Sequence, residues 1–166
     1  NGRTYKLSEI FHSPNHVIAF LGIASSHELA ALATAEIYDL GLLKQGNGGT
    51  QALPRYRCTP DGTQIDNITD WGLAQFIAHY GKKPGGRDLS KDAIFAYVYG
   101  VLHDPVYRET YAQNLKRDFP RIPFQRDFWL WADWGRRLLD LHIGYAEQDP
   151  WLVKRMASVR ALAAGR

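Results

Sequence analysis

Two patterns of apolar and polar positions meet near residue 66. Before it, apolar residues form short runs: residues 16–23 (HVIAFLGI) suit a buried strand. Residues 51–58 (QALPRYRC) suit an edge strand, because Pro54 cannot donate a ladder hydrogen bond. Residues 28–43 fit two alternatives, since their alanines and leucines favour a helix whereas ALATAEIYDL also fits a half-buried strand. Residues 46–50 (GNGGT) indicate a loop.

Beyond residue 66 the apolar spacing becomes helical. Thr69 or Asp70 is expected to cap a helix that runs to about Tyr80 and stops at Gly81. Residues 82–88 (KKPGGRD) predict a loop. Ser90 then caps a second helix, whose apolar face comprises Ile94, Phe95, Val98, Val101 and Leu102.

Two Asp-Pro pairs and one further aspartate predict the remaining helices. Asp104-Pro105 starts a helix to about Asp118, and residues 121–123 are expected to be extended because each proline disfavours helix before it. Asp127 opens an amphipathic helix to about Ala146, and Asp149-Pro150 starts a last one. The apolar stripe of the Asp127 helix is predicted to be Phe128, Trp131, Trp134 or Gly135, Leu138, Leu141 and Tyr145.

These elements predict an α+β fold. A small, mainly antiparallel sheet from residues 16–60 is expected to pack against a helical layer from residues 69–163. A chain of 166 residues has the size of a single domain, so residues 1–166 are expected to form one. The chain begins Asn-Gly without an initiator methionine, and we expect it to be a fragment of a longer protein.

The composition bears on the location of the chain and on the kinds of site it can hold, but it does not indicate a function. No apolar run approaches the ~18 residues of a membrane span, so no membrane partner is expected. The single cysteine, Cys58, excludes an internal disulfide framework and a cysteine-rich zinc site, and is compatible with a cytoplasmic location. The net charge of +3 comes from residues 117–166. Three charges are too few to argue for nucleic-acid binding by themselves.

One segment resembles a catalytic motif. Asp104-Pro105-Val106-Tyr107 is similar to the Asp/Asn-Pro-Pro-Tyr/Phe loop with which amino-methyltransferases hold a flipped base. Here valine replaces the second proline, and the segment lies between two predicted helices instead of after a strand. We therefore interpret it as a helix cap. GNGGT lacks the lysine and the following helix of a phosphate loop, so no cofactor is expected.

The histidines and the one Ser-His neighbourhood give no catalytic or metal-binding constellation. Pro14 separates His12 from His16 and spoils a shared helical face, and Ser25-Ser26-His27 are neighbours in sequence without being a triad. The other histidines are interpreted as capping or packing residues: His79, His103 and His142. No catalytic residue and no metal ligand is predicted.

Two small basic groups are candidate DNA contacts. Arg55 and Arg57 alternate along the predicted edge strand with Tyr56 between them, which would place both guanidinium groups on one face. Lys82, Lys83 and Arg87 crowd a glycine–proline loop that can approach a phosphate backbone. Solvated surface charge remains the alternative for both groups.

Three long segments carry a family resemblance. Residues 69–81 (TDWGLAQFIAHYG), 92–124 and 128–146 (FWLWADWGRRLLDLHIGYA) resemble successive motifs of the C-terminal specificity region of Type ISP restriction–modification enzymes and related helicase–adenine-N6 DNA methyltransferases. AFLGIASS, LATAEIYDL, LPRYR and DNITDW fit the same order more loosely. The resemblance covers about residues 17–146. The GNGGT loop and the tail after Ala146 depart from the family pattern.

The resemblance implies a part in DNA target recognition. Full-length members combine a nuclease, a DNA-translocating ATPase and an adenine methyltransferase with this region, so the implied partners are double-stranded DNA and the methyltransferase and helicase modules of a parent chain. The fragment is then expected to be non-catalytic by itself, although its parent resembles an enzyme. The alternative is a structural coupling domain of the same parent without direct DNA contact.

Overall fold

A three-stranded antiparallel sheet forms the upper layer of the molecule in the computed structural model, which describes residues 14–21, 28–39, 41–43 and 50–148. Strand β1 (Val17–Leu21) is buried along its whole length and lies between β2 (Ala31–Thr34) and β3 (Thr50–Pro54). Ile18 faces Ala33 on one side and Leu53 on the other. The predicted buried strand is confirmed, and the ambiguous segment supplies a strand. Residues 46–49 and the helix expected from Asp149 lie outside the described residues.

The expected edge strand over residues 51–58 is two strands. β3 ends at Pro54, and the chain bends at Arg55 before β4 (Tyr56–Cys58) pairs with β5 (Gln64–Asp66) in a separate hairpin. Pro54 lies at the end of β3 and on the sheet edge, as its missing N–H requires. The bend corrects the prediction that Arg55 and Arg57 share one face of one strand.

The helices begin at the predicted caps. α2 (Asp70–Tyr80), α3 (Lys91–Leu102), α4 (Pro105–Thr110) and α6 (Phe128–Ile143) are capped by Thr69, Ser90, Asp104 and Asp127, each of which accepts a hydrogen bond from a first-turn amide. A 3₁₀ turn, η1 (Pro84–Gly86), lies in the 82–88 loop, and η2 (Tyr145–Glu147) follows α6. The helix expected from Pro105 to Asp118 is broken, because Tyr111 (φ −105°, ψ 16°) separates α4 from α5 (Ala112–Leu115).

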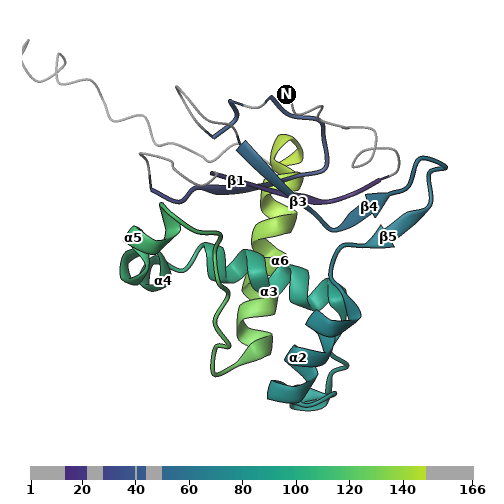
Figure 1. Cartoon of the computed structure of the whole chain (residues 1–166), viewed down its shortest axis with the longest axis vertical. Helices are drawn as coiled ribbons and strands as arrows, with labels where there is room; N and C mark the ends of the chain where they lie inside the picture. Colours follow the sequence, from purple (N-terminus) through teal and green to yellow (C-terminus); the bar gives the residue numbers. More distant parts are fainter. Residues whose placement is uncertain (1–13, 22–27, 40, 44–49, 149–166) are drawn as a thin grey trace, which may run out of the picture.

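α3 is the central element of the core. Ile94, Phe95, Val101 and Leu102 of the predicted apolar face are buried, and burial extends beyond that face to nearly all sides of the helix. The reason is its position: β1 and β2 pack above it and α6 crosses it (Figure 1). A helix enclosed in this way needs apolar residues all round.

α3 and α6 cross at two glycines with their backbones almost in contact. A Cβ atom on Gly135 would lie 1.8 Å from the Ala96 carbonyl oxygen, and one on Gly100 would lie 2.6 Å from the Trp131 carbonyl oxygen. This crossing turns the small-residue side of α6 inward, so its buried residues are Phe128, Ala132, Gly135 and Leu139. The predicted stripe is therefore displaced: Trp131 and Leu138 are half-buried, whereas Trp134, Leu141 and Tyr145 are exposed.

Two buried tyrosine hydroxyls tie the layers together. Tyr99 Oη accepts a hydrogen bond from the Ala33 amide of β2 (2.8 Å), and burial raises the pKa of Tyr99 to about 12. Tyr97 Oη accepts from the Gln125 amide (2.6 Å) and donates to the Pro123 carbonyl (2.7 Å). Tyr99 thus holds the sheet to α3, and Tyr97 holds the segment before α6.

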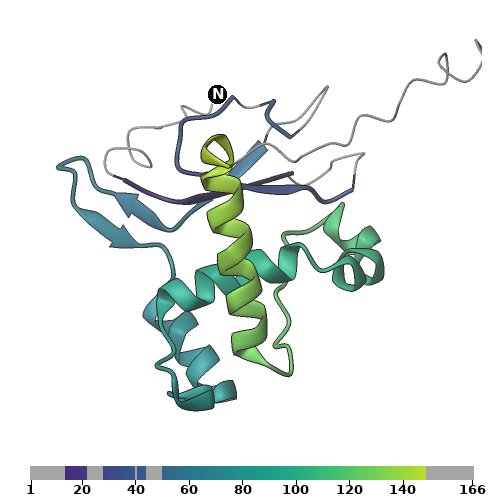
Figure 2. The same ribbon diagram turned by 180° about the vertical axis from the view of Figure 1, so that it is seen from behind.

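Different elements occupy two opposite sides of the molecule. The β4–β5 hairpin projects beside the sheet, with α2 below it on the same side, and α4 and α5 lie on the opposite side (Figures 1 and 2). The predicted α+β fold, with the sheet in the N-terminal third and helices after it, is confirmed.

Candidate nucleic-acid interface

The loop between α2 and α3 presents two lysines on a fixed backbone. Positive φ values at Gly81 (82°), Gly85 (58°) and Gly86 (82°) shape the loop, and these are conformations that glycine adopts readily. The Leu89 amide donates to the Lys82 carbonyl (3.0 Å), and Trp129 Nε1 donates to the Pro84 carbonyl (2.6 Å). Lys82 and Lys83 are exposed, and Lys83 forms a solvent-exposed ion pair with Asp88 (3.3 Å).

Arg87 is bound from two directions. Its guanidinium makes a bidentate pair with Asp133 of α6 (2.8 and 3.0 Å) and lies 3.7 Å from the centroid of the Trp129 ring. The hydrogen bond from Arg87 holds the pKa of Asp133 below its usual range. Arg87 therefore fastens the loop to α6, although about half of its side chain remains exposed.

A hollow of about 830 Å³ lies where the end of α2, the loop and the start of α6 meet. Arg87 and the exposed Arg126 line it, together with polar and aromatic groups that include His79, Tyr80, Asp127 and Trp129. Arg126 was not among the predicted contacts. It immediately precedes the cap of α6, and only the tertiary packing of α6 against the loop brings it beside Arg87.

Arg55 is an internal residue. Its side chain is only 7% exposed; Nε donates to Asp92 (2.6 Å) and Nη1 donates to Asp66 (2.5 Å). Lys91 also reaches Asp66 (3.1 Å), so the start of α3 and the hairpin share one ion-pair network. The hydrogen bond from Arg55 is the main reason why the pKa of Asp66 is lowered.

Arg57 lies on the outer side of the hairpin. The register places it opposite Ile65, and both side chains are exposed, whereas Cys58 on the other face is buried. No ion pair joins Arg57 to another residue in the described part of the chain. Arg55 and Arg57 thus differ in role although they are two residues apart.

The structure gathers the lysines of the loop but separates them from Arg57. The hairpin and the loop lie at opposite ends of α2, whose 11 residues span about 16 Å. Both ends are on the same side of the molecule (Figures 1 and 2). The candidate contacts therefore form two points along one edge.

The other residues considered for chemistry have structural roles. Asp104 caps α4 through the Val106 amide (2.9 Å), and Tyr107 is buried with its hydroxyl bonded to the Arg121 carbonyl (3.0 Å), so it cannot stack on a flipped base. Burial lowers the pKa of His103 and His142, which contact the backbone carbonyl and the hydroxyl of Tyr99, respectively. Among the described residues, no group of histidine, cysteine or acidic side chains is arranged to hold a metal ion.

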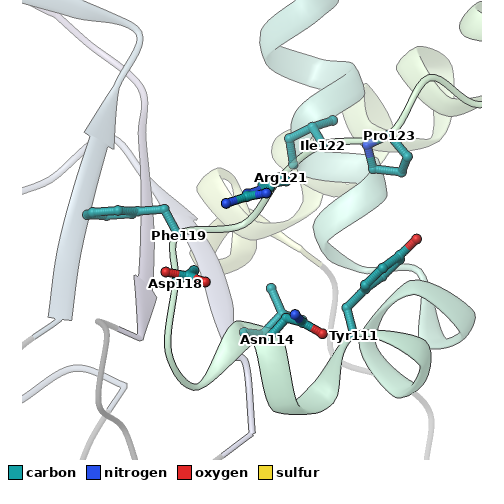
Figure 3. A pocket seen from close by; sticks show the side chains of 8 residues that line it. Tyr111, Asn114, Asp118, Phe119, Arg121, Ile122 and Pro123 are labelled. Carbon is teal, nitrogen blue, oxygen red and sulfur yellow. The ribbon is translucent and has the colours of Figure 1, made fainter.

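A second hollow, of about 520 Å³, lies beside α5 (Figure 3). Tyr111, Asn114, Asp118 and Ile122 line it, and the Phe119 ring extends toward the sheet, where it contacts Phe20 with ring centroids 6.0 Å apart. Asp118 and Arg121 are the charged side chains among its lining residues, and the others are mostly apolar, so we interpret this hollow as a packing feature and not as a binding site.

None of the described helices is long and apolar enough to cross a membrane.

Comparison with known proteins gives consistent matches. Residues 2–161 match the family described as Type ISP C-terminal specificity domain. The chain resembles a solved DrdV–DNA complex with a TM-score of 0.82 and 41% identity, covering 98% of this chain and 16% of that one. It also resembles a nuclease-deletion mutant of the Type ISP restriction–modification enzyme LlaGI in complex with a DNA substrate mimic, with a TM-score of 0.69 and 32% identity over 88% of this chain and 12% of that one. Among curated proteins no significant match is found. The chain thus corresponds to less than a fifth of the length of these two solved relatives.

Proposed function

The chain belongs to the family of Type ISP C-terminal specificity domains, and we propose that it recognises double-stranded DNA for a larger restriction–modification protein. The observation that carries the proposal is the similarity to DrdV, whose structure was solved with DNA and which matches almost the whole of this chain at 41% identity. In this role the domain supplies recognition. The catalytic steps belong to methyltransferase and helicase modules of a parent chain, which acts in the cytoplasm. Residues 1–166 act as one recognition unit in this proposal, which is supported by the described strands and helices that pack on the α3 core.

Four of the predicted contacts fit this role directly, and the fifth fits it indirectly. Lys82 and Lys83 are exposed point charges of the kind that bind phosphates, and Arg87 and Arg57 keep exposed guanidinium groups on the same side of the molecule. Arg55 is buried, so it supports the hairpin through Asp66 and Asp92 instead of contacting DNA itself.

Replacing Lys82 and Lys83 together by alanine is expected to weaken duplex binding about tenfold at 0.1 M salt. It should also reduce the slope of log K against log salt by about two, because each phosphate contact releases close to one counterion. The measurement is fluorescence anisotropy of a labelled duplex of arbitrary sequence, repeated between 50 and 200 mM salt. Circular dichroism checks that the variant is folded.

The matched control is the double variant Arg117→Ala/Arg121→Ala. It removes the same charge from two exposed residues that follow α5, a helix on the side of the molecule opposite to the hairpin and α2 (Figures 1 and 2). Its slope should remain close to that of the unmodified chain. Equal losses in the two double variants, or no salt-sensitive binding by the unmodified chain, would contradict the proposal.

A second candidate function, coupling to neighbouring modules without DNA contact, is favoured by one surface. Leu130, Trp134, Leu141 and Tyr145 form an exposed apolar stripe along α6 and into η2, with exposed fractions from 44% to 76%. Stripes of this kind often mark a contact with another protein surface. The stripe does not include the α6 residues that hold the loop, Trp129 and Asp133, so coupling through it is compatible with DNA recognition. It becomes the preferred function only if the folded chain does not bind duplex DNA.

A further inference from the structure

The β4–β5 hairpin has two faces of different character. Cys58 is buried on the inner face, and Gln64 on that side donates through Nε2 to the Pro14 carbonyl (3.2 Å). Arg57 and Ile65 are cross-strand partners on the outer face, and Ile65 is 42% exposed. Both side chains are exposed, so these two groups are accessible to a ligand.

The hairpin is held rigidly at both ends. At its tip, the Thr59 amide donates to the Thr63 carbonyl (2.9 Å), and Gly62 has a positive φ of 87° that closes the three-residue turn. Asp61 accepts from the Thr59 hydroxyl and the Thr63 amide (3.3 Å), so its carboxylate is used inside the turn. At its base, buried Arg55 joins the hairpin to α3 through Asp66 and Asp92. Rigid support of this kind preorganises the outer face for binding.

The shape of the hairpin matches a groove of duplex DNA. A two-stranded ribbon fits the major groove, which is about 12 Å wide, and the hairpin projects clear of the sheet and α2 (Figure 1). The loop with Lys82 and Lys83 lies at the far end of α2, a helix about 16 Å long, so it can meet phosphates outside the groove that the hairpin occupies. Lysines in that position anchor the duplex without reading its bases.

The chemistry of the outer face matches base edges. An arginine fork donates two hydrogen bonds to guanine O6 and N7, and aliphatic side chains contact the methyl group of thymine. Arg87 cannot act in this way while its donors are engaged by Asp133. Arg57 has no such partner in the described part of the chain, and it belongs to the hairpin that projects.

We propose that the β4–β5 hairpin is the base-reading element of the domain, in which Arg57 reads a guanine in the major groove and Ile65 contacts the methyl group of a nearby thymine. This inference rests on the proposed function, since it assigns the readout within a DNA-binding surface. The two sites then have different roles. Arg57 and Ile65 determine sequence preference, whereas Lys82 and Lys83 provide salt-sensitive affinity.

Arg57→Gln is the sharpest test, because glutamine pairs with adenine where arginine pairs with guanine. The unmodified chain and its variants select from a library of duplexes with a randomised central segment, and the bound fraction is sequenced. The unmodified chain should enrich a motif that contains guanine. Arg57→Gln should change one guanine of that motif to adenine, with at least about a tenfold loss of preference for guanine at that position, and leave the other positions unchanged. Ile65→Ala should weaken the preference for thymine at a neighbouring position of the motif and leave the preference for guanine unchanged.

The control Arg117→Gln removes the same charge on the side of α5 and should select the motif of the unmodified chain. A motif without guanine, or an Arg57→Gln variant that is folded and still prefers guanine at every position, overturns the inference and leaves DNA binding in place. If the folded, unmodified chain enriches no sequence at all, the proposed function itself fails. The two failures are therefore distinguishable in one experiment.

Discussion

Gly135→Ala is expected to lower the free energy of unfolding by at least about 3 kcal/mol, which is the upper end of the range for overpacking a core. The new Cβ atom would lie 1.8 Å from the carbonyl oxygen of Ala96 and 2.8 Å from the amide nitrogen of Gly100. Both atoms belong to the backbone of α3, so no side-chain rotation can relieve the overlap and the two helices must separate. Thermal unfolding followed by circular dichroism should show a loss of roughly 10 °C in Tm.

Gly72→Ala is the matched control for this prediction. Gly72 is also a helical glycine, but a Cβ atom there would meet only the Thr69 side chain at 3.4 Å and the Ile68 side chain at 3.8 Å, which are ordinary contacts. Alanine is the better helix former, so this variant should be neutral or stabilised by up to about 1 kcal/mol. A Gly135→Ala variant as stable as Gly72→Ala would show that α3 and α6 do not cross as described.

Arg55→Met is expected to lower the free energy of unfolding by about 2–3 kcal/mol. The substitution removes two charge-assisted hydrogen bonds while keeping most of the buried aliphatic part of the side chain. Asp66 would keep Lys91, but Asp92 would lose its bond to the hairpin. Urea unfolding at pH 7 measures the loss. The variant should also lose base preference in the duplex selection although Arg57 is unchanged, because the hairpin is no longer fastened to α3.

Lys83→Met provides the comparison for stability alone. Both side chains of the Lys83–Asp88 pair are exposed, so its loss should lower the free energy of unfolding by less than about 1 kcal/mol.

The loss of stability caused by Arg55→Met should also depend on pH. Because Arg55 depresses the pKa of Asp66 in the folded chain, the stability from this pair is complete above the unfolded pKa near 3.8 and is lost as the pH falls through the lower folded value. The difference between Arg55→Met and the unmodified chain should therefore be smaller at pH 3 than at pH 7.

Local signals predicted the helical half of the fold well. Thr69, Ser90, Asp104 and Asp127 are caps because each needs only its own first turn, and Gly81 ends α2 with a positive φ. Features that depend on distant partners were not predictable in this way. Residues 31–34 form a strand because β1 pairs with them, and α6 buries Gly135 instead of Trp134 because α3 comes so close.

In the candidate site, too, features set by local sequence were predictable, and features set by distant partners were not. The exposure of Lys82 and Lys83 follows from a glycine–proline loop, and sequence reasoning predicted that loop. The burial of Arg55 depends on Asp66 and Asp92, which are 11 and 37 residues away, so alternation along a strand could not reveal it. The hairpin was missed although a signal was present: Thr59-Pro60-Asp61-Gly62-Thr63 has the proline, aspartate and glycine order of a tight turn between strands.

One ratio of dissociation constants shows whether this domain recognises a specific duplex sequence. The first constant is for a duplex that contains the selected motif, and the second is for a duplex of the same composition with the motif shuffled, both at 0.15 M salt. Specific DNA-binding proteins commonly prefer their site by a factor of about 10³ or more, and we expect a ratio of that order for the unmodified chain. A ratio near one for the folded chain would show that the domain does not distinguish DNA sequences.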